Sequence, residues 1–291
     1  MLTKQKSYAE QGGALYLVPT PIGNLEDMTY RSIQTLRSAD HIASEDTRNT
    51  QKLLNHFDIK VPQISLHEHN YKERIPQLLQ WLRQGETIAQ VSDAGMPSIS
   101  DPGHELVEAC VAENIPVISL PGATAGVTAL IASGIQPQPY LFYGFLPRKH
   151  REVVAALEPL QQESATLIFY ESPYRIAQLL QWMQEVFSAQ RSVCLCRELT
   201  KLHEEYIRGT LAEVAEYCSQ HTIKGECCLI VSGALPEESV AETAEEWQHL
   251  SLKEQVEREI ELGQKPKEAI KEVARRNQLK KQVVYNAYHE I

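Results

Sequence analysis

The amino-acid sequence predicts an α/β protein that contains two α/β domains and a small C-terminal helical unit of helix-turn-helix type. Three observations predict this organisation. Between residues 14 and 235, short apolar or β-branched runs alternate with amphipathic helical patterns. The segment Gln136-Pro137-Gln138-Pro139 interrupts regular structure, because proline continues neither a helix nor a central strand. Residues 251–291 carry amphipathic and basic helical patterns.

The first α/β domain is expected over residues 14–136. Its strands are expected at 15–18, 41–43, 63–66, 87–91 and 116–120. Helices are expected at 28–37, 47–57, 71–83 and 105–113, with another after Pro121. Because a helix separates each strand from the next, we expect βαβ units and a largely parallel sheet.

The second α/β domain is expected over residues 140–235. Its strands are expected at 141–145, 166–170, 192–196 and 226–231, with helices at 151–162, 174–187 and 211–219. The acidic segment that follows is short of large apolar residues, so residues 236–250 are expected to be a linker.

The last unit, residues 251–291, is expected to contain helices at 252–261, 267–276 and 280–289. Ala274 precedes Val284 by ten residues, which is the spacing of the small and apolar positions in a helix-turn-helix motif. In the tight turn at 277–279, Gln278 occupies the place where that motif usually has glycine. A generic three-helix bundle is the alternative interpretation.

Length and composition indicate a globular protein that folds without disulfide or metal staples. Of the 291 residues, 43% are hydrophobic and 23% are charged. A chain of this length and composition can bury a hydrophobic core large enough to stabilise its fold. The longest apolar stretches fall short of the ~18 residues that a membrane-spanning helix needs, and residues 1–13 lack the apolar region of a secretory signal. The six cysteines show no C-x-x-C spacing. We therefore expect a cytoplasmic protein with buried free thiols and no metal site.

Charge is distributed unevenly along the chain. The formal net charge is −10, which argues against a general nucleic-acid coat. Residues 263–291 nevertheless carry seven Lys and Arg against three Glu, so this tail is +4 and the remaining chain is −14. A segregated basic tail is typical of phosphate contact, and a solvated helix surface is the alternative.

The segment after the first expected strand, residues 18–24, differs from known phosphate-binding loops. Dinucleotide-binding proteins carry G-x-G-x-x-G here, so that backbone N–H groups approach a pyrophosphate. Pro19 and Pro21 have no backbone N–H, and Gly23 is the only glycine in the segment. The chain has no G-x-x-x-x-G-K-[ST] motif either. We therefore expect a ligand without phosphates.

Candidate functional residues follow the carboxyl ends of the expected strands, where open α/β sheets bind ligands. Glu45 and Asp46 follow the second strand, at the position of a ribose-binding acid. The alternative is structural, with Thr47 capping a helix and Arg48 forming an ion pair.

Two further loops of this domain, residues 92–103 and 120–125, are expected to form one pocket. The first contains two Asp, two Gly and two Pro, and the second contains small residues that permit close backbone approach. Asp101 has the alternative role of capping the helix after Pro102.

In the second domain, the loops at 169–175 and 197–201 also follow strands. Their residues Glu171 and Arg197 are candidates, although an ion pair between elements is the alternative. His67 and His69 have metal-like spacing without a third ligand of obvious type nearby, so a metal role is not expected.

Six of these segments together resemble the signature blocks of the ribosomal RNA small subunit methyltransferase I family, within the tetrapyrrole (corrin/porphyrin) methylase superfamily. The resemblance implies two α/β domains with S-adenosylmethionine in the cleft between them, a homodimer, and an RNA-binding C-terminal helical unit. It also implies 2′-O-methylation of a cytidine in the decoding region of small-subunit (16S) ribosomal RNA. The blocks occur in order along the chain, at 18–24, 44–48, 91–103, 120–125, 169–175 and 197–201.

Roles for individual residues follow from this resemblance and from the chemistry. Methyl transfer to a ribose hydroxyl needs alignment and removal of the hydroxyl proton, so a nearby carboxylate or imidazole helps. Among Glu45, Asp46, Asp101, Glu171 and His67 we favour Glu45, Asp46 and Glu171 as catalytic, since they come from opposite domains and could flank a cleft. Cofactor contacts are implied at Ile22, Asp93, Ala94, Gly95, Pro97, Gly122, Ala123, Thr124, Tyr170, Arg197, Glu198 and Leu199. RNA phosphate contacts are expected at Arg48, Arg175, Lys201, Lys271, Arg275, Lys280 and Lys281.

Two other functions are open at this point. One is methylation of a tetrapyrrole precursor of the uroporphyrinogen or precorrin type, against which the basic tail, the 44–48 block and the absence of a G-x-G-x-G loop argue. The other is a ligand-sensing DNA-binding regulator that uses the C-terminal helices. The long α/β region ahead of that tail exceeds what a sensor requires.

Overall fold

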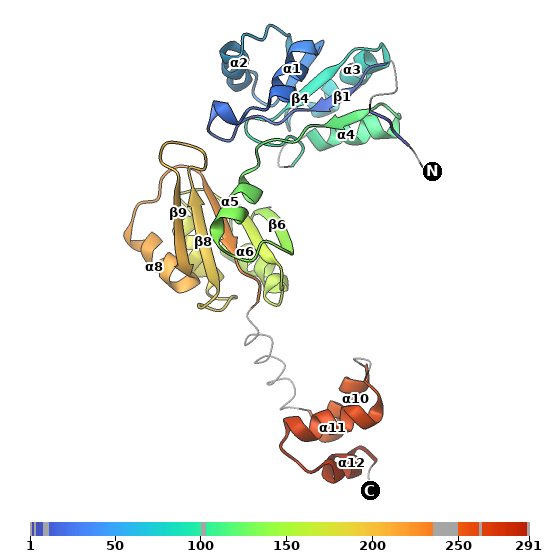
Figure 1. Ribbon diagram of the computed structural model, residues 1–291, viewed down its shortest axis with the longest axis vertical. Coiled ribbons are helices and arrows are strands. Elements are labelled where there is room, and N and C mark those ends of the chain that lie inside the picture. Colours follow the sequence, from blue (N-terminus) through green and yellow to red (C-terminus); the bar gives the residue numbers. More distant parts are fainter. Residues whose placement is uncertain are drawn as a thin grey trace. The chain divides into compact units, whose positions relative to one another are not determined.

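The computed structural model (Figure 1) describes residues 2, 4–7, 12–99, 103–234, 250–261 and 264–289. The chain divides into two compact units, one of Met1–Gln161 with Ala165–Gly233 and one of Gln162–Ser164 with Ala234–Ile291. The first unit contains two sheets, and the second contains the C-terminal helices. Apart from residue 250, the expected linker lies outside the described residues.

The first sheet has five strands in the order β3-β2-β4-β1-β5, and every neighbouring pair is parallel. In the register, Leu15 lies opposite both Ile88 and Val117. A helix connects each strand to the next, which confirms the parallel βαβ organisation expected for this half of the chain. The strands are β1 (Leu15–Leu17), β2 (His41–Ser44), β3 (Gln63–Ser65), β4 (Ile88–Val91) and β5 (Val117–Ser119).

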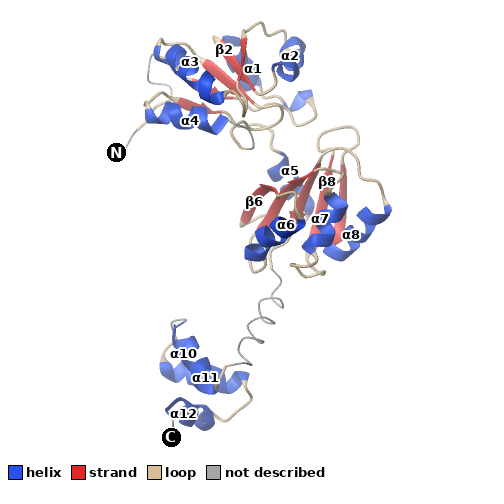
Figure 2. Ribbon diagram, turned by 180° about the vertical axis from the view of Figure 1, so that it is seen from behind, coloured by secondary structure: helices blue, strands red, loops and turns tan. Residues whose placement is uncertain are grey.

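Helices cover both faces of this sheet (Figure 2). The helices are α1 (Tyr30–Ser38), α2 (Thr47–His56), α3 (Tyr71–Arg83) and α4 (Gly103–Ala112), with a 3₁₀ turn η1 (Leu25–Asp27) before α1. Leu36 of α1 and Leu54 of α2 share one buried cluster with Ala89, whereas Leu78 of α3 shares the opposite cluster with Ile88. Successive residues of a strand face opposite sides, so β4 is buried on both.

The second sheet is mixed, with the order β6-β7-β10-β8-β9. Its strands are β6 (Tyr140–Phe145), β7 (Thr166–Glu171), β8 (Ser192–Arg197), β9 (Glu205–Thr210) and β10 (Cys227–Val231). Only the β6–β7 pair of this sheet is parallel, in contrast to the first sheet. The edge strand β9 was not expected from the sequence. The loop between β8 and β9 is too short for a crossover helix, so these strands pair as a hairpin.

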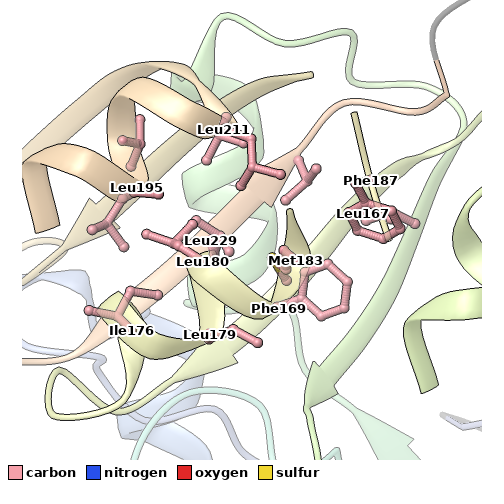
Figure 3. Packing of buried hydrophobic residues seen from close by; sticks show 14 of the residues in the cluster. Leu167, Phe169, Ile176, Leu179, Leu180, Met183, Phe187, Leu195, Leu211 and Leu229 are labelled. Atoms are coloured by element: carbon pink, nitrogen blue, oxygen red, sulfur yellow. The ribbon is translucent and has the colours of Figure 1, made fainter. Parts of the chain in front are cut away.

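Two buried clusters lie on opposite faces of the second sheet. On one face, Phe169 of β7 and Leu229 of β10 pack with Leu180 and Met183 of α7 (Figure 3). On the other face, Leu130 belongs to a cluster with Ile168 and Ile230. Leu130 lies in α5, which precedes the expected domain boundary yet packs against this second sheet. The helices of this half are α5 (Ala125–Ser133), α6 (His150–Leu157), η2 (Glu158–Leu160), α7 (Ile176–Met183) and α8 (Leu211–Gln220).

The described part of the C-terminal unit contains α10 (Leu252–Glu261), α11 (Pro266–Arg276) and α12 (Lys281–His289), close to the expected helices. Ala274 and Val284 are buried in one cluster, as the helix-turn-helix spacing predicts. Gln278 has φ +54°, the left-handed conformation that glycine adopts most easily, which explains the preference of such turns for glycine.

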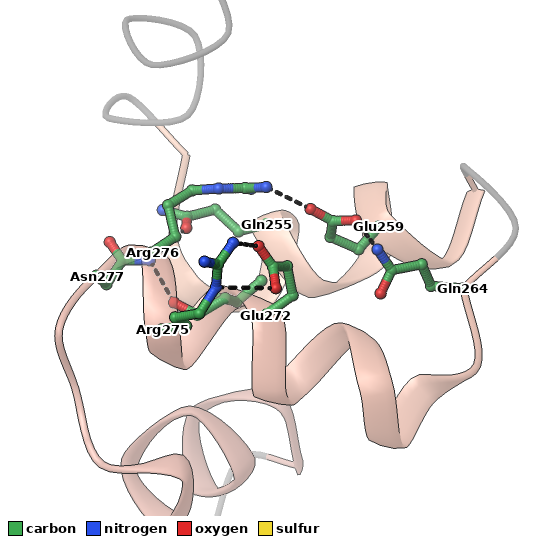
Figure 4. A network of polar contacts seen from close by, with 8 residues as sticks. Gln255, Glu259, Gln264, Glu272, Arg275, Arg276 and Asn277 are labelled. Carbon is green, nitrogen blue, oxygen red and sulfur yellow. Dashed lines mark hydrogen bonds and ion pairs between the residues drawn. The ribbon is translucent and has the colours of Figure 1, made fainter. Parts of the chain in front are cut away.

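A polar network crosses the helices of this unit (Figure 4). The carboxylate of Glu259 on α10 accepts hydrogen bonds from Arg276 (2.6 Å) and Gln264 (2.8 Å). Asn277 donates to Gln255 at 2.7 Å. Glu259 and Gln255 are both buried, so these bonds supply the partners that buried polar groups require.

All six cysteines are buried and free, which confirms the expected state of the thiols. Within the described ranges, no helix has both the length and the apolar character to cross a membrane. No cluster of three or more His, Cys, Asp or Glu side chains that could hold a metal ion occurs among the same residues.

Candidate functional site

A cavity of about 570 Å³ lies in the first unit, where the strand-end loops of both sheets meet. Its volume is in the range of small-molecule sites, and apolar side chains form much of its wall. The described residues that line it are Ile22, Glu45, Ser92, Ala94, Gly95, Met96, Ile99, Thr124, Ala125, Phe145, Arg148, Tyr170, Glu171, Ser172, Pro173, Leu199, Glu226, Cys227 and Cys228.

The loop after β1 and the loop after β4 are bound to each other by backbone hydrogen bonds. The N–H groups of Thr20 and Gly95 each donate to the other residue's carbonyl oxygen, at 3.0 and 3.1 Å. The Thr20 hydroxyl donates to the Ser92 carbonyl at 3.1 Å. Gly95 has φ +81°, a conformation that side chains other than glycine adopt only with strain. This part of the cavity wall is therefore a fixed backbone surface.

The loop after β5 approaches the first loop very closely at Gly122. A Cβ atom on Gly122 would lie 2.3 Å from the Cβ and 2.6 Å from the Cγ of Pro19. The close backbone approach expected for residues 120–125 is thus present. Thr124, two residues further on, lines the cavity.

Tyr170 connects the second sheet to α5. The Gly126 N–H, in the first turn of α5, donates to the Tyr170 hydroxyl at 2.9 Å. The Tyr170 ring packs edge-to-face against Phe142 (centroids 5.1 Å apart) and Phe145 (5.5 Å). Burial raises the pKa of the phenol above its usual value, so it stays neutral and serves as a fixed wall.

Glu171 brings a buried carboxylate to the cavity. Its side chain is 2% exposed, and Oε2 lies 3.3 Å from Nη2 of Arg175. Oε1 accepts a hydrogen bond from the Ser172 N–H at 2.7 Å. Arg175 also donates to the carbonyl of Pro147 at 2.7 Å, so one guanidinium connects the β7 end to the β6 end. The alternative pairing of Glu171 with Arg197 is wrong, because Arg197 pairs with Glu205 at 2.5 Å instead.

Glu45 and Asp46 are adjacent in sequence, but their surroundings differ. Glu45 lines the cavity, and its Oε2 lies 3.4 Å from the Asp93 backbone nitrogen, which donates to it. Asp46 is the N-cap of α2, with Oδ1 accepting from the Arg48 N–H at 2.8 Å and Oδ2 2.7 Å from the Arg48 guanidinium. These bonds from Arg48 lower the Asp46 pKa to about 2. The ion pair of Arg48 was expected, but the cap is Asp46 and not Thr47.

The implied cofactor residues divide into two groups. Ile22, Ala94, Gly95, Thr124, Tyr170 and Leu199 belong to the described cavity lining. Asp93 instead accepts hydrogen bonds from the Asp46 N–H at 3.2 Å and from the Asn49 amide at 3.0 Å, and it lines a smaller cavity of about 250 Å³. The described lining of the larger cavity does not include Pro97, Gly122, Ala123, Arg197 or Glu198.

The cations expected to contact RNA in the α/β half already have partners. Arg48 pairs with Asp46, and Arg175 pairs with Glu171. Lys201 Nζ lies 2.9 Å from both Glu198 and Glu226. In the C-terminal unit, Arg275 pairs with Glu272, and the four expected contacts Lys271, Arg275, Lys280 and Lys281 are exposed. Of the remaining candidates, Asp101 lies outside the described residues, and the described lining does not include His67.

Five lining residues were missed from the sequence, namely Phe145, Arg148, Glu226, Cys227 and Cys228. The strand-end rule, applied to β6 as to the other strands, would have found Phe145 and Arg148. The other three lie at the amino end of β10. They reach the cavity because β10 runs antiparallel to β7, with Cys227 opposite Glu171. The sequence carried no signal for that pairing.

The fold and the site geometry define a class of protein. The family model of Tetrapyrrole (Corrin/Porphyrin) Methylases matches residues 14–215, and the chain belongs to this class. Solved structures agree on the fold: uroporphyrin-III C-methyl transferase from Thermus thermophilus, complexed with S-adenyl homocysteine, has a TM-score of 0.53 at 19% identity and covers 76% of this chain and 97% of that one. A cobalt precorrin-4 methyltransferase has a TM-score of 0.55 at 16% identity, with 75% and 94% covered.

Curated relatives narrow the class to one family. The ribosomal RNA small subunit methyltransferase I of Streptococcus pyogenes serotype M3 is 52% identical over 289 residues, which cover 99% of each chain. The Bacillus subtilis protein of the same name is 49% identical over 291 residues, again with 99% of each chain covered. Within the tetrapyrrole methylases, the chain therefore belongs to the ribosomal RNA small subunit methyltransferase I family.

Proposed function

We propose that the chain transfers the methyl group of S-adenosylmethionine to the 2′-hydroxyl of a cytidine in small-subunit ribosomal RNA. Full-length relatives at about half identity that are named for this RNA support the substrate class. The observation that carries the proposal is the cavity of about 570 Å³, into which strand ends of both sheets bring a fixed backbone wall and two carboxylates, Glu45 and Glu171.

The residues of the cavity fit the proposed cofactor. S-adenosylmethionine supplies a methyl group already activated by a sulfonium, and it has no phosphate. The donor-poor loop after β1 and the fixed backbone at Gly95 suit such a ligand, since neither offers a pyrophosphate cradle. In this proposal, contacts come from the six implied residues that line the cavity, which are Ile22, Ala94, Gly95, Thr124, Tyr170 and Leu199.

Two carboxylates are proposed to act on the acceptor. Glu45 and Glu171 line the cavity from the first and the second sheet, respectively, so either can receive or orient the proton of a ribose hydroxyl placed between them. Nη2 of Arg175 lies 3.3 Å from Oε2 of Glu171 and holds this buried side chain in place at the cavity wall. Asp46 has a pKa of about 2, which makes it a weak base at neutral pH. Its proposed part is to start α2 beside Glu45.

The C-terminal unit is proposed to hold the RNA through its exposed cations Lys271, Arg275, Lys280 and Lys281. Removal of residues 263–291 is expected to flatten the salt dependence of RNA binding and to leave cofactor binding intact. We also propose a homodimer. Light scattering of the full-length chain tests this proposal, and the mass of a single copy would overturn it.

The central experiment is methyl transfer from labelled S-adenosylmethionine into small ribosomal subunits and into their free RNA, followed by nuclease mapping. Label in the ribose of one cytidine is the expected result. Label in a base, or label found only when a uroporphyrinogen is supplied, would overturn the proposal. Glu45→Gln and Glu171→Gln are expected to lower turnover more than cofactor affinity, with Asp46→Asn as the comparison of smaller effect.

A further inference from the structure

Arg148 brings a positive charge to the wall of the cavity. Among the described residues that line the cavity, it is the only lysine or arginine. Its side chain is exposed and makes no hydrogen bond or ion pair within the described part of the chain. Arg175, which is also expected to contact phosphate, pairs with Glu171, and Lys201, expected to do the same, pairs with Glu198 and Glu226.

The charges around the cavity leave Arg148 available to an anion. Glu171 and Glu226 are carboxylates in the described lining, and each has a cation close by: Arg175 lies 3.3 Å from Glu171, and Lys201 lies 2.9 Å from Glu226. A cation already held in such a pair gives up an existing contact when it binds a phosphate. Arg148 makes no such pair within the described part of the chain, so among the described lining residues it is the one best suited to a polyanion.

The backbone next to Arg148 is held in place. The Arg175 guanidinium donates to the carbonyl of Pro147 at 2.7 Å, while its other contact is the buried Glu171. Lys149, the residue after Arg148, is the N-cap of α6. Arg148 is thus flanked on both sides by fixed residues, although its own side chain is exposed.

Two exposed aromatic side chains accompany this cation. Phe145, at the end of β6, lines the cavity and is 61% exposed, with its ring packed edge-to-face on Tyr170. Tyr174 is 93% exposed and follows the lining residue Pro173. Exposed rings combined with an arginine are the usual means of holding single-stranded nucleic acid, since bases stack on the rings and the cation binds the backbone.

We propose that Arg148 binds a backbone phosphate of a single-stranded acceptor RNA beside the nucleotide in the cavity, and that Phe145 stacks on a base of the same strand. This inference rests on the proposed function and assigns the RNA entrance of that site. Duplex RNA does not present unstacked bases to Phe145, so the acceptor is expected to be unpaired at this position.

The test compares Arg148→Gln with Arg151→Gln in the full-length chain. Arg151 is an exposed arginine on α6, three residues further on, and it is not among the described lining residues. Both variants remove one positive charge from the same surface. RNA affinity is measured by fluorescence anisotropy at several salt concentrations, cofactor affinity by calorimetry, and methyl transfer with the labelled cofactor.

Arg148→Gln is expected to weaken RNA binding about tenfold and to reduce the salt slope by about one, while cofactor affinity is unchanged and KM for RNA rises. Phe145→Leu is expected to weaken binding to unpaired RNA by at least about fivefold and to leave the salt slope unchanged. Arg151→Gln is expected to match the wild type.

Three results would overturn the inference: RNA affinity of Arg148→Gln equal to wild type, equal losses in both arginine variants, or a loss of cofactor affinity in place of RNA affinity. The last result would mean that Arg148 binds the cofactor carboxylate. If the wild-type chain transfers no methyl group to ribosomal RNA, the proposed function fails, and these affinity measurements still report on the RNA entrance separately.

Discussion

The contact between Gly122 and Pro19 makes a substitution of Gly122 by alanine informative. The new Cβ would lie 2.3 Å from one atom of the proline ring and 2.6 Å from another. Carbon atoms normally approach to about 3.5–4.0 Å, so one of the two loops would have to move by more than about 1 Å. Proline cannot rotate out of the way, because its ring is closed on the backbone.

The expected cost is that of overpacking a tight contact, about 1–3 kcal/mol. With a urea m-value of about 3 kcal/mol/M, Gly122→Ala lowers the unfolding midpoint of the α/β unit by about 0.3–1 M. Because Thr124 follows in the same loop and lines the cavity, affinity for S-adenosylhomocysteine is expected to fall as well.

The control is Gly12→Ala, since a Cβ on Gly12 meets no atom within 4 Å. Urea unfolding followed by tyrosine and tryptophan fluorescence, together with calorimetry, measures both effects. If Gly122→Ala unfolds at the same urea concentration as wild type and binds the cofactor product equally well, the account of a fixed loop contact is refuted.

Four further outcomes are expected. Arg175→Ala leaves the buried Glu171 charge without its cation and is expected to cost about 3–5 kcal/mol in urea unfolding; a loss below about 1 kcal/mol would contradict the pairing. The pKa of Asp46 is lowered from 3.8 to about 2 in the folded chain, so the ionised side chain stabilises the fold above pH 3.8, and this stabilisation is lost as the pH falls through about 2. Asp46→Asn retains a capping side chain but has no carboxyl to titrate. Its free energy of unfolding is therefore expected to fall less than that of the wild type as the pH is lowered. Gln278→Gly relieves a left-handed backbone and is expected to stabilise the C-terminal unit by up to about 1 kcal/mol, measured as slower amide exchange in α11 and α12. Burial raises the Cys227 pKa to about 12, so iodoacetamide at pH 8 is expected to leave this thiol unmodified in the folded chain, and rapid labelling would contradict its burial.

Sequence periodicity predicted the strands and helices whose buried positions produce a regular apolar pattern in the sequence. The strand β4 lies between two buried clusters and therefore reads as a nearly continuous apolar run. The edge strand β9 was missed because Glu205, Arg208 and Gly209 interrupt any such pattern, and its side chains are mostly half-buried. An edge strand needs apolar residues on fewer positions, so its sequence resembles a loop.

The parts of the candidate site that lie at the ends of strands could be predicted from the sequence. The parts that depend on pairing between distant residues could not. The rule that ligands bind at strand ends located Glu45, Tyr170 and Glu171 on the cavity wall. It could not tell which cations were already neutralised. Lys201 is paired with Glu226 only because β10 lies beside β8 in the sheet, and no local pattern records that neighbour.

The position of α5 has a consequence for how the chain can be divided. A cut at the proline-rich segment after this helix would leave α5 with the N-terminal fragment and strip the second sheet of the cover over Ile168 and Ile230. Fragment complementation is therefore expected to succeed with a break just after Leu120, because α5 then belongs to the same fragment as the sheet that it covers. A break at residue 136 is expected to yield a C-terminal fragment with an exposed apolar sheet face, which aggregates and precipitates.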